Sequence, residues 1–515
     1  MSNRTWEIVD RPNNRKPIGS RFVLKTKLDR NGDVDRRKAR LVAKGYAQRP
    51  GMDFLDTFAP VARGSTIRLM MALSAELGLT VHQMDVVTAF LNGEVEEEIY
   101  LDLPDQLENT LSDIIENPKG VDASLLELAK QWMGEIRSNG QKACRVRKAI
   151  YGLKQSGRQW FKRLDRELKQ LGLQPTKCDP CLYYRRTGTA ITLFAVYVDD
   201  ILIATNDCGK NGEMDQLKQT LMKTFKMKDM GPVSYCLGIE FQQHSDGSIT
   251  MCQSKYSKEI LTRFNMDDCN PISTPLDGNE KLKKPDSQED TTKYPYQSLI
   301  GSLMYLAVST RPDISYTVSA LSQFNQNHGE EHWNAAKRVL RYLKGTLDYG
   351  LTFRKTGESL HGYVDADWAG CIDDRRSFTG YCFILADAAI SWESKKQRTV
   401  ALSSTEAEYM ALSEGSKEAL YLQNLLGELD IKTNPIVLFN DNQGAQELMK
   451  NPVHHARTKH IDVRHHFVRE AYEEGKIEPR YIPTEEMVAD VFTKSLFGPK
   501  HNVCTEWLGV SDLSP

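Results

Sequence analysis

Apolar and polar residues change their spacing several times along the chain, and each change predicts a different element. RFVLKTKL and RKARLVAKG stand on either side of the turn sequence DRNGD, which predicts a hairpin of two basic strands over residues 20–45. Apolar residues recur at helical spacing in residues 66–78, TIRLMMALSAELG, and predict a helix. The run VHQMDVVTAF has the β-branched, apolar character of a strand and meets the turn pair Asn92-Gly93.

Three longer stretches complete the pattern. Residues 105–141 are acidic and helix-prone, as is typical of a surface insertion, and residues 269–295 are polar and turn-rich, which predicts a linker or long loop. The helical stretch EHWNAAKRVLRYLKG follows, with a basic surface formed by Lys337, Arg338, Arg341 and Lys344. Solvation explains that surface as well as nucleic-acid binding does. From about residue 358 to 494 the order strand, strand, strand, helix, strand, helix predicts an α/β domain.

Length and charge add limits to this pattern. The 515 residues leave room for roughly three domains of about 150 residues each. The formal net charge of −2 neither requires nor excludes an anionic partner. The local distribution is more informative, because twelve Lys or Arg residues lie between Arg15 and Arg49 against three Asp residues. We call residues 15–49 the basic arm and expect it to bind nucleic acid.

Cysteines and apolar runs indicate the compartment. Ten cysteines are scattered without a regular framework, which fits a reducing compartment better than a secreted, disulfide-linked protein. The pair Cys178 and Cys181 has no second pair of ligands nearby, so two ordinary thiols explain it better than zinc does. No apolar run approaches about 18 residues, and the N-terminus is polar. We therefore expect neither a signal peptide nor a membrane partner.

Two adjacent aspartates, Asp199 and Asp200, interrupt an otherwise strand-like run in YVDDILIAT. A pair of carboxylates between apolar flanks is unfavourable unless a cation or a proton neutralises it. A strand, a short corner and a second strand would place both side chains at a hairpin tip, where they can point toward one site. On this motif alone, a hairpin turn with two solvated aspartates is an equally good interpretation.

A third aspartate favours a metal site. Asp85 ends an apolar approach in MDVVTAFLNG and is followed five residues later by Phe90. Three carboxylates from two β elements can bind two Mg²⁺ ions about 3.5–4 Å apart, the arrangement of phosphoryl transfer. Between the two elements lies KAIYGLKQSGRQW, where Lys148, Lys154 and Arg158 flank a flexible Ser-Gly step that is suited to close approach of a nucleotide or template.

With these motifs the chain resembles the reverse transcriptase and ribonuclease H portion of a copia-type long-terminal-repeat retrotransposon Pol polyprotein. The matching stretches follow the family's order over nearly the whole chain: ARLVAKGYAQRPGMDFLDTFAPVAR, HQMDVVTAFLNGEVEEEIY, KAIYGLKQSGRQWFKRL, YVDDILIAT, YCLGIEF, QSKYSKEIL, IGSLMYLAVSTRPDI, AKRVLRYLKGT, GYVDADWAG, SSTEAEYMAL and KHIDVRHHFVRE. The resemblance implies an α+β and α/β multidomain protein. Its expected parts are fingers and palm in residues 1–235, a thumb and connection region in 236–357, a ribonuclease H-like α/β domain in 358–497 and a tail in 498–515.

The resemblance also implies roles for residues of the polymerase part. Asp85, Asp199 and Asp200 become metal carboxylates, with two Mg²⁺ ions per site and Mn²⁺ as an alternative ion. Phe90 takes the position of a large side chain beneath the sugar, which excludes a 2′-hydroxyl. The other implied contacts are Lys154 and Gln155 with the incoming nucleotide or template, Leu237 and Gly238 as the primer grip, and Lys25, Lys27, Lys38 and Arg40 with the triphosphate.

In the third region the acids that resemble a ribonuclease H metal site are Asp365, Glu408, Asp441 and Asp490. The choice of glutamate depends on the helix start, because Ser403 with Glu406 and Thr405 with Glu408 both have capping-box spacing. We favour Glu408 as the ligand and Glu406 as the cap. Asp367 is a decoy two residues beyond Asp365. A zinc site at His454, His455, His460, His465 and His466 lacks cysteine partners, and His460 is the best candidate for assisting product release or proton transfer.

The implied function is RNA-directed DNA polymerisation with ribonuclease H activity. Its partners would be an RNA template, a DNA primer, an RNA:DNA hybrid and deoxynucleoside triphosphates, in the cytoplasm, with a nuclear step at integration as an alternative location. No protease, coat or integrase signature is visible, so we expect a fragment whose upstream integrase or coat protein is a further partner. A catalytically silent nucleic-acid-binding relic is the alternative. The ribonuclease H region disfavours a third interpretation, an intron-encoded palm polymerase.

Overall fold

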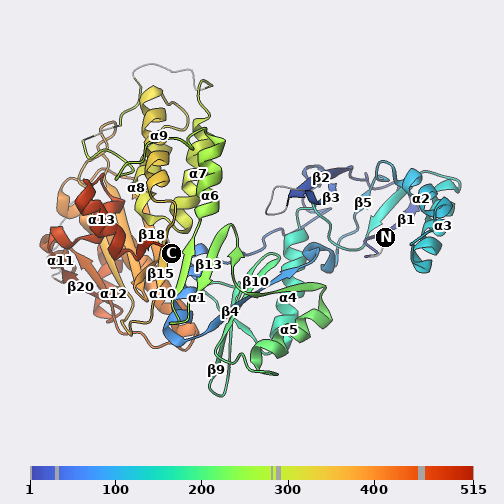
Figure 1. Cartoon of the computed structure of the whole chain (residues 1–515), viewed down its shortest axis with the longest axis horizontal. Helices are drawn as coiled ribbons and strands as arrows, with labels where there is room; N and C mark the ends of the chain where they lie inside the picture. Colours follow the sequence, from blue (N-terminus) through green and yellow to red (C-terminus); the bar gives the residue numbers. More distant parts are fainter. Residues whose placement is uncertain (1–2, 29–33, 280–281, 286–291, 451–458, 514–515) are drawn as a thin grey trace.

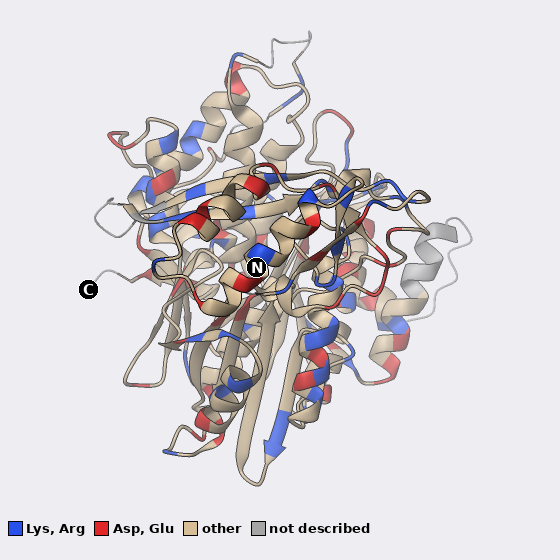
Figure 2. Cartoon of the chain, turned by 90° about the vertical axis from the view of Figure 1, so that its right-hand side faces the viewer, with Lys and Arg blue, Asp and Glu red and all other residues tan. Residues whose placement is uncertain are grey.

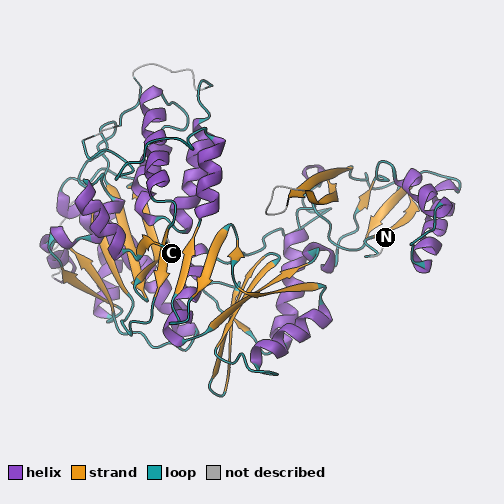
Figure 3. Cartoon of the chain, in the orientation of Figure 1, coloured by secondary structure: helices purple, strands orange, loops and turns teal. Residues whose placement is uncertain are grey.

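The computed structural model describes residues 3–28, 34–279, 282–285, 292–450 and 459–513. The molecule is elongated (Figure 1): a small N-terminal body lies at one end, a strand-rich middle part follows, and a large body that contains the C-terminal half lies at the other end. Helices gather at the top of the large body, and strands run through the rest of it and through the middle part (Figure 3). Among the described residues, no helix combines the length and apolar character that crossing a membrane requires.

The N-terminal body is a three-stranded sheet covered by two helices. Its strands, in the order β1–β6–β5, are β1 (Trp6–Asp10), β6 (Lys142–Val146) and β5 (Tyr100–Leu101), and its helices are α2 (Leu107–Glu116) and α3 (Ala123–Arg137). Trp132 of α3 stacks on Trp6 of β1 at 6.1 Å between ring centroids. The helical character predicted for residues 105–141 is confirmed, but the expectation of a surface insertion is corrected, because α2 and α3 supply apolar side chains to this core.

The predicted basic hairpin is formed by β2 (Ser20–Leu28) and β3 (Val34–Ala43), which pair only with each other. In the observed register Lys25 lies opposite Lys38 and Val23 lies opposite Arg40. Side chains two apart on a strand share a face, so Lys25, Lys38 and Arg40 lie on one face of the hairpin. Phe22 and Leu24 lie on the other face, 50% and 77% exposed.

The middle part is a six-stranded antiparallel sheet in the order β11–β4–β10–β9–β8–β7. Its strands are β4 (Thr80–Val86), β7 (Gln174–Pro175), β8 (Leu182–Thr187), β9 (Ala190–Tyr197), β10 (Asp200–Thr205) and β11 (Met227–Pro232). The accompanying helices are α1 (Gly64–Leu77), α4 (Ser156–Gln170) and α5 (Glu213–Thr224), with short 3-10 turns at η1 (Gly45–Ala47) and η2 (Ala89–Asn92). The predicted helix at residues 66–78 and the predicted strand after it are therefore confirmed as α1 and β4.

A five-stranded sheet follows in the order β12–β13–β14–β15–β21. Its strands are β12 (Tyr235–Cys236), β13 (Ile239–Gln243), β14 (Ile249–Cys252), β15 (Tyr349–Phe353) and β21 (Val510–Asp512). Between β14 and β15 the described residues form four helices and one 3-10 turn: α6 (Ser254–Arg263), α7 (Tyr296–Ser309), η3 (Pro312–Ile314), α8 (Ser315–Ser322) and α9 (Glu330–Gly345). The boundary predicted at residue 235 thus falls inside β12.

The described part of the predicted linker, residues 269–295, contains no helix or strand. It runs along α9, where Arg341 donates to the carbonyl of Asn270 at 2.8 Å and Arg338 donates to the Thr274 hydroxyl at 3.0 Å. Two of the four basic residues predicted to form a surface on α9 therefore hold the linker.

The C-terminal region contains the predicted strand, strand, strand, helix, strand, helix, and it adds the helix α11 before the last of these and the strand β20 after it. Its sheet, β18–β17–β16–β19–β20, pairs β16 antiparallel to β17 and parallel to β19. The elements are β16 (His361–Ala366), β17 (Phe378–Leu385), β18 (Ala388–Lys396), α10 (Ser404–Glu428), β19 (Ile436–Asn440), α11 (Gln443–Lys450), α12 (Lys459–Glu473), β20 (Ile477–Tyr481), η4 (Thr484–Glu486) and η5 (Val488–Phe492). The expected tail is corrected, since it folds into α13 (Gly498–Trp507) and β21, which pairs with β15.

Candidate active sites

The first candidate site lies where three strands of the middle sheet meet. Asp85 is near the end of β4, Asp200 begins β10, and the two residues are direct partners in the antiparallel register. Asp199 occupies the turn before β10, and its carbonyl accepts a 2.9 Å hydrogen bond from the Val86 amide. Val198 in the same turn has a φ of 59°, a left-handed conformation that a β-branched residue rarely adopts. The hairpin thus brings all three predicted carboxylates to one end of paired strands.

These carboxylates interact electrostatically. Burial raises the pKa of Asp200, and the charges of Asp199 and Asp85 raise it further, whereas a 3.1 Å hydrogen bond from the Gln83 amide opposes the shift. Burial raises the pKa of the Cys236 thiol, and the carboxylates of Asp200 and Asp199 raise it further. Carboxylate oxygens are the ligands that Mg²⁺ prefers, so the donor types fit a divalent cation, although among the described residues these three acids do not form a group with ligand atoms within 4.8 Å of one another.

Two of the residues predicted to contact the nucleotide, Arg40 of the basic hairpin and Phe90 of η2, lie on either side of Tyr151. The Arg40 guanidinium lies 4.9 Å from the ring centroid of Tyr151, and that ring lies 4.8 Å from the ring of Phe90. Burial raises the pKa of the Tyr151 phenol, and the charges of Asp199 and Asp85 raise it further. Lys25 and Lys38 share the face of Arg40, and the side chain of Lys27 lies outside the described residues. The structure therefore brings Phe90 and Arg40 together through Tyr151, which the sequence analysis missed.

Acidic residues partly neutralise the basic arm. Arg49 lies 3.6 Å from a carboxylate oxygen of Asp53, and Arg15 lies 3.7 Å from one of Glu98. Figure 2, which views the molecule from the side of the N-terminal body, shows Lys and Arg interspersed with Asp and Glu. The register places Lys25, Lys38 and Arg40 on one face of the hairpin, where an anionic ligand would meet three basic side chains.

Lys154 and Gln155 have different surroundings from those predicted. The Gln155 side chain is fully buried: its amide nitrogen donates to the Asp53 carbonyl at 2.8 Å and its oxygen accepts from Gln48 at 2.9 Å. The direct nucleotide contact predicted for Gln155 is corrected, because the side chain instead fixes the loop around Asp53 to the start of α4. Lys154 is exposed, with its ammonium 4.7 Å from the ring centroid of Phe54.

The predicted primer grip is the tight turn between β12 and β13. Leu237 and Gly238 both have positive φ, 53° and 71°. The Tyr305 hydroxyl of α7 donates to the Leu237 carbonyl, and Gln253 donates to the Gly238 carbonyl at 3.3 Å. A Cβ at Gly238 would lie 2.6 Å from the Tyr305 oxygen, so this position requires glycine. Tyr305 and Gln253 position the turn and had no signal in the sequence.

The second candidate site lies in the C-terminal sheet. Asp365 comes from β16, Glu408 from α10 and Asp441 from the residue after β19, and one ligand atom of each lies within 4.8 Å of the others. Among the residues that the structure describes, this is the only group of three metal-ligating side chains so close together. Burial raises the pKa of Glu408 well above its usual range, and Asp365 and Asp441 raise it further. A bound divalent cation would relieve that repulsion, so the donor set fits one.

The two glutamates at the start of α10 have different partners. Ser403 is the N-cap, and its hydroxyl accepts from the Glu406 amide at 3.1 Å while Glu406 accepts from the Leu402 amide at 2.8 Å. Glu408 instead accepts from the Asn440 amide at 3.0 Å and from the Ala366 backbone at 3.1 Å. The structure therefore places Glu406 as the cap and Glu408 at the acidic site. Asn440, which also donates to the Val364 carbonyl, was missed.

Asp490 and Asp367 flank the acidic group. Burial and the charge of Asp365 raise the pKa of Asp490 to about 7. The Lys494 ammonium lies 2.7 Å from Asp490 and 3.9 Å from Asp365, so it balances both charges. Asp367 accepts from the Phe378 amide, and burial raises its pKa to about 6. Neither Asp367, the predicted decoy, nor Asp490, a predicted ligand, belongs to the 4.8 Å group of described ligands, so both assignments stay predictions. The side chain of His460 lies outside the described residues.

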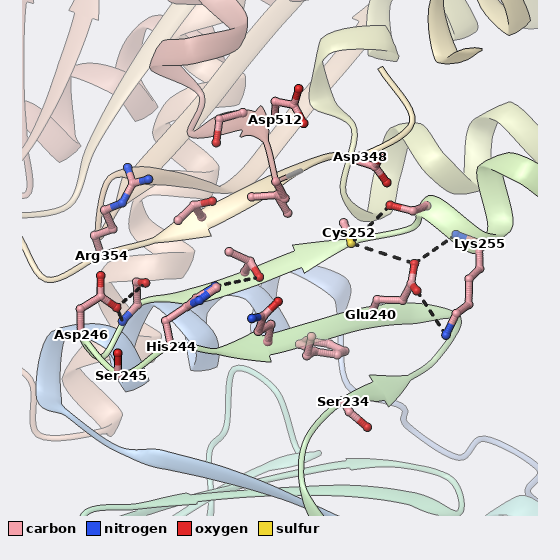
Figure 4. A pocket seen from close by; sticks show the side chains of 18 residues that line it. Ser234, Glu240, His244, Ser245, Asp246, Cys252, Lys255, Asp348, Arg354 and Asp512 are labelled. Atoms are coloured by element: carbon pink, nitrogen blue, oxygen red, sulfur yellow. Dashed lines mark hydrogen bonds and ion pairs between the residues drawn. The ribbon is translucent and has the colours of Figure 1, made fainter. Parts of the chain in front are cut away.

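A separate polar hollow of about 670 Å³ lies on the five-stranded sheet. Figure 4 shows its lining, with Glu240 beside Lys255 and Cys252, and with His244 and Asp246 farther along the sheet. Glu240 and Lys255 form an ion pair at 3.3 Å. None of the predicted site residues is among the described residues that line it. Its mixed charges do not match an anion-binding surface.

Comparisons with known proteins show the family to which the chain belongs. Residues 3–117 and 123–278 match the family described as "Reverse transcriptase (RNA-dependent DNA polymerase)". The chain is 40% identical over 99% of its length to the retrovirus-related Pol polyprotein from transposon TNT 1-94 of Nicotiana tabacum, and 38% identical over its full length to that from transposon RE2 of Arabidopsis thaliana. It spans 37% and 33% of those relatives.

A solved foamy viral protease-reverse transcriptase in complex with dsDNA aligns over 93% of this chain and 79% of its own, at 12% identity and a TM-score of 0.42. The family match covers more than half of the residues, and the retrotransposon relatives match from end to end. The chain therefore belongs to the reverse transcriptase family, and over its whole length it matches a portion of retrotransposon Pol polyproteins of the copia type.

Proposed function

We propose that this chain is an RNA-directed DNA polymerase that extends a primer on an RNA or DNA template, and that its C-terminal domain degrades RNA in RNA:DNA hybrids. The observation that carries the polymerase proposal is the register of Asp85 with Asp200, next to Asp199 in the preceding turn. The observation that supports the ribonuclease H proposal is the group of Asp365, Glu408 and Asp441 within 4.8 Å.

Each site would hold Mg²⁺, two ions per site, with Mn²⁺ as an alternative. Bound there, the ions would activate the attacking oxygen and stabilise the leaving oxygen. Asp85, Asp199 and Asp200 would hold them at the polymerase site. Lys38 and Arg40 of the hairpin would neutralise the triphosphate, and Phe90 would lie beneath the sugar and exclude a 2′-hydroxyl.

At the second site Asp365, Glu408, Asp441 and Asp490 would hold the ions. Asp490 carries the raised pKa described above and lies beside Lys494, so it would join the set once it is ionised. The substrates are an RNA template, a DNA primer, deoxynucleoside triphosphates and the RNA:DNA hybrid. An integrase or coat protein of the same element would be a partner, and copying would take place in the cytoplasm.

Primer extension tests the polymerase proposal. Wild-type protein with poly(rA), oligo(dT), dTTP and Mg²⁺ should extend the primer, and an Asp199→Asn, Asp200→Asn double variant should not, because neutral amides cannot hold the ions. Chelation with EDTA should stop wild-type extension. Equal extension by both proteins would overturn the catalytic assignment, and no extension by either would favour a nucleic-acid-binding relic.

Release of labelled RNA from an RNA:DNA hybrid tests the second site. Asp441→Asn should abolish release while primer extension continues, since the two acidic groups lie on different sheets. Loss of both activities together would contradict two separate sites. Binding of the hybrid should weaken steeply with rising salt if the basic hairpin contacts phosphates. A flat salt response would remove that contact from the proposal.

A further inference from the structure

Tyr151 lies between the hairpin strand β3, which is proposed to bind the triphosphate, and the turn η2, which is proposed to select the sugar. On one side the guanidinium of Arg40, from hairpin strand β3, lies 4.9 Å from the Tyr151 ring centroid. On the other side the Phe90 ring, from η2, lies 4.8 Å away at an interplanar angle of 55°. All three side chains are partly buried. Contacts between two aromatic rings and between a cation and a ring face are both directional, so a change in one neighbour is felt by the other.

The backbone around Tyr151 fixes it to the hairpin. Its carbonyl accepts a 2.8 Å hydrogen bond from the amide of Ala43, the last residue of β3. The next residue, Gly152, has a φ of 95°, and a Cβ there would overlap the Ala43 carbonyl. A Cβ at Gly45 would likewise overlap the Gly152 carbonyl. The loop therefore moves with the end of β3, and Tyr151 moves with Arg40.

The backbone around Phe90 is fixed to the palm. The Gly93 amide donates to the Phe90 carbonyl at 2.9 Å, and the Gly93 carbonyl accepts from the Ala149 amide at 2.9 Å. A Cβ at Gly93 would lie 2.8 Å from the backbone of Gln159 in α4. With the main chain held in this way, rotation of the Phe90 side chain is the remaining freedom, and the Tyr151 ring limits it.

The Tyr151 phenol stays protonated at neutral pH. Burial raises its pKa, the carboxylates of Asp199 and Asp85 add to that effect, and the Arg40 guanidinium opposes it. A neutral phenol can accept a hydrogen bond from Arg40 without adding a negative charge beside the three acids. The ring contacts both Phe90 and the Arg40 guanidinium, whereas the hydroxyl adds a hydrogen bond with Arg40 alone, so the Phe90 contact depends on the ring and not on the hydroxyl.

We propose that Tyr151 is a positioning residue that couples sugar selection to triphosphate binding, by holding the Phe90 ring against the sugar and the Arg40 guanidinium toward the phosphates. This inference rests on the proposed polymerase function. It assigns the loop sequence AIYGLKQ a role in specificity that its single basic residue, Lys154, does not supply. Removal of the ring should weaken discrimination against ribonucleotides, whereas removal of the hydroxyl should mainly weaken phosphate binding.

Three single variants and one double variant test this proposal. The single variants are Tyr151→Leu, Tyr151→Phe and Phe90→Ala, and the double variant combines Phe90→Ala with Tyr151→Leu. On poly(rA) with oligo(dT), kcat and KM are measured for dTTP and for UTP. Tyr151→Leu should lower the dTTP preference about tenfold, and Tyr151→Phe should retain the preference while raising KM for both nucleotides. If Tyr151 acts through Phe90, the double variant should discriminate no worse than Phe90→Ala alone.

A second measurement does not depend on turnover. With a dideoxy-terminated primer, which blocks chemistry, the affinities of the protein–primer–template complex for dTTP and UTP should show the same loss of preference in Tyr151→Leu. An unchanged preference in Tyr151→Leu, or additive losses in the double variant, would overturn the role of Tyr151 while leaving the polymerase proposal in place. Absence of nucleotide binding and of extension by the wild type would overturn both. Ribonuclease H activity on a hybrid serves as the control for folding.

Discussion

Two glutamates at the start of α10, Glu406 and Glu408, differ in burial and in the charges around them. Glu406 closes the first turn through the Leu402 amide, at the helix surface. Glu408 is 5% exposed and lies among other carboxylates, which raise its pKa together with burial. A cap contributes to stability, whereas a buried carboxylate that faces like charges reduces it. Substitution should therefore separate stability from activity at these two positions.

Glu406→Ala should lower the free energy of unfolding by about 0.5–1.5 kcal/mol and leave hybrid degradation intact, because it removes the hydrogen bond from the Leu402 amide while the Ser403 N-cap remains. Glu408→Gln should abolish hybrid degradation with unchanged or greater stability, since the amide keeps the volume and relieves the repulsion from Asp365 and Asp441. Urea unfolding and release of labelled RNA measure the two effects. Loss of degradation in Glu406→Ala at a temperature where it is folded would contradict this division.

At this scale the sequence predicts residue types better than it predicts burial. The capping-box spacing allowed either Ser403 or Thr405 as the cap, and only the observed start of α10 at Ser404 decides between them. Gln155 was predicted to contact the nucleotide because of its position in the motif. Its side chain is instead buried and hydrogen-bonded to Gln48 and Asp53, which lie about a hundred residues away in the chain. Such long-range contacts have no periodic signal in the sequence.

At the scale of elements, the joint between β3 and the loop before α4 depends on the absence of a side chain at Gly152. Gly152→Ala should displace the hairpin, because its Cβ would overlap the Ala43 carbonyl and lie 2.7 Å from the Val42 side chain. We expect primer extension to fall and stability to drop by about 1–3 kcal/mol, while hybrid degradation persists.

The matched control is Gly188→Ala in the turn between β8 and β9. Its φ is 61°, so it tests the strain of a left-handed residue, but a Cβ there meets nothing within 4 Å. Gly188→Ala should therefore lower stability slightly without affecting extension. Equal losses of extension in the two variants would show that backbone strain, and not the fit of the hairpin against the loop, is responsible.

Elements with strong periodicity were predictable, and those that depend on distant partners were not. The hairpin, α1, β4 and α9 each carry a local pattern, and the structure has them where the pattern indicates. The strand β21 has only three residues, too few for a recognisable local pattern. It forms by pairing antiparallel with β15, which is distant in the sequence. Likewise, α2 and α3 read as a surface insertion because the small sheet that they cover is assembled from strands on both sides of them.

At the scale of the whole molecule, Arg68 joins three regions that the sequence analysis treats as separate. From α1 it donates to the carbonyls of Val308 and Ser309 at 2.8 and 2.9 Å, and to that of Ile390 in β18 at 2.8 Å. Its guanidinium lies 3.8 Å from the ring centroid of Trp392. Burial lowers its pKa to about 9, which leaves it charged at neutral pH. Arg68 therefore links the helix α1, the end of α7 and the C-terminal sheet, and we expect this link to help set the separation between the two acidic sites.

Arg68→Met should loosen this link, because it leaves three carbonyls without their donor and keeps most of the buried side-chain volume. We expect a loss of about 3 kcal/mol or more in unfolding free energy, roughly 1 kcal/mol or more for each carbonyl left unsatisfied, with early proteolytic cleavage between the middle part and the C-terminal region. During copying of a labelled RNA template, the distance from the primer end to the RNA cut should become more variable, although each activity persists when assayed alone. Arg68→Lys keeps the charge but cannot reach all three carbonyls, so its effect should be intermediate. A wild-type distribution of cuts in Arg68→Met would show that other contacts fix the separation of the two sites.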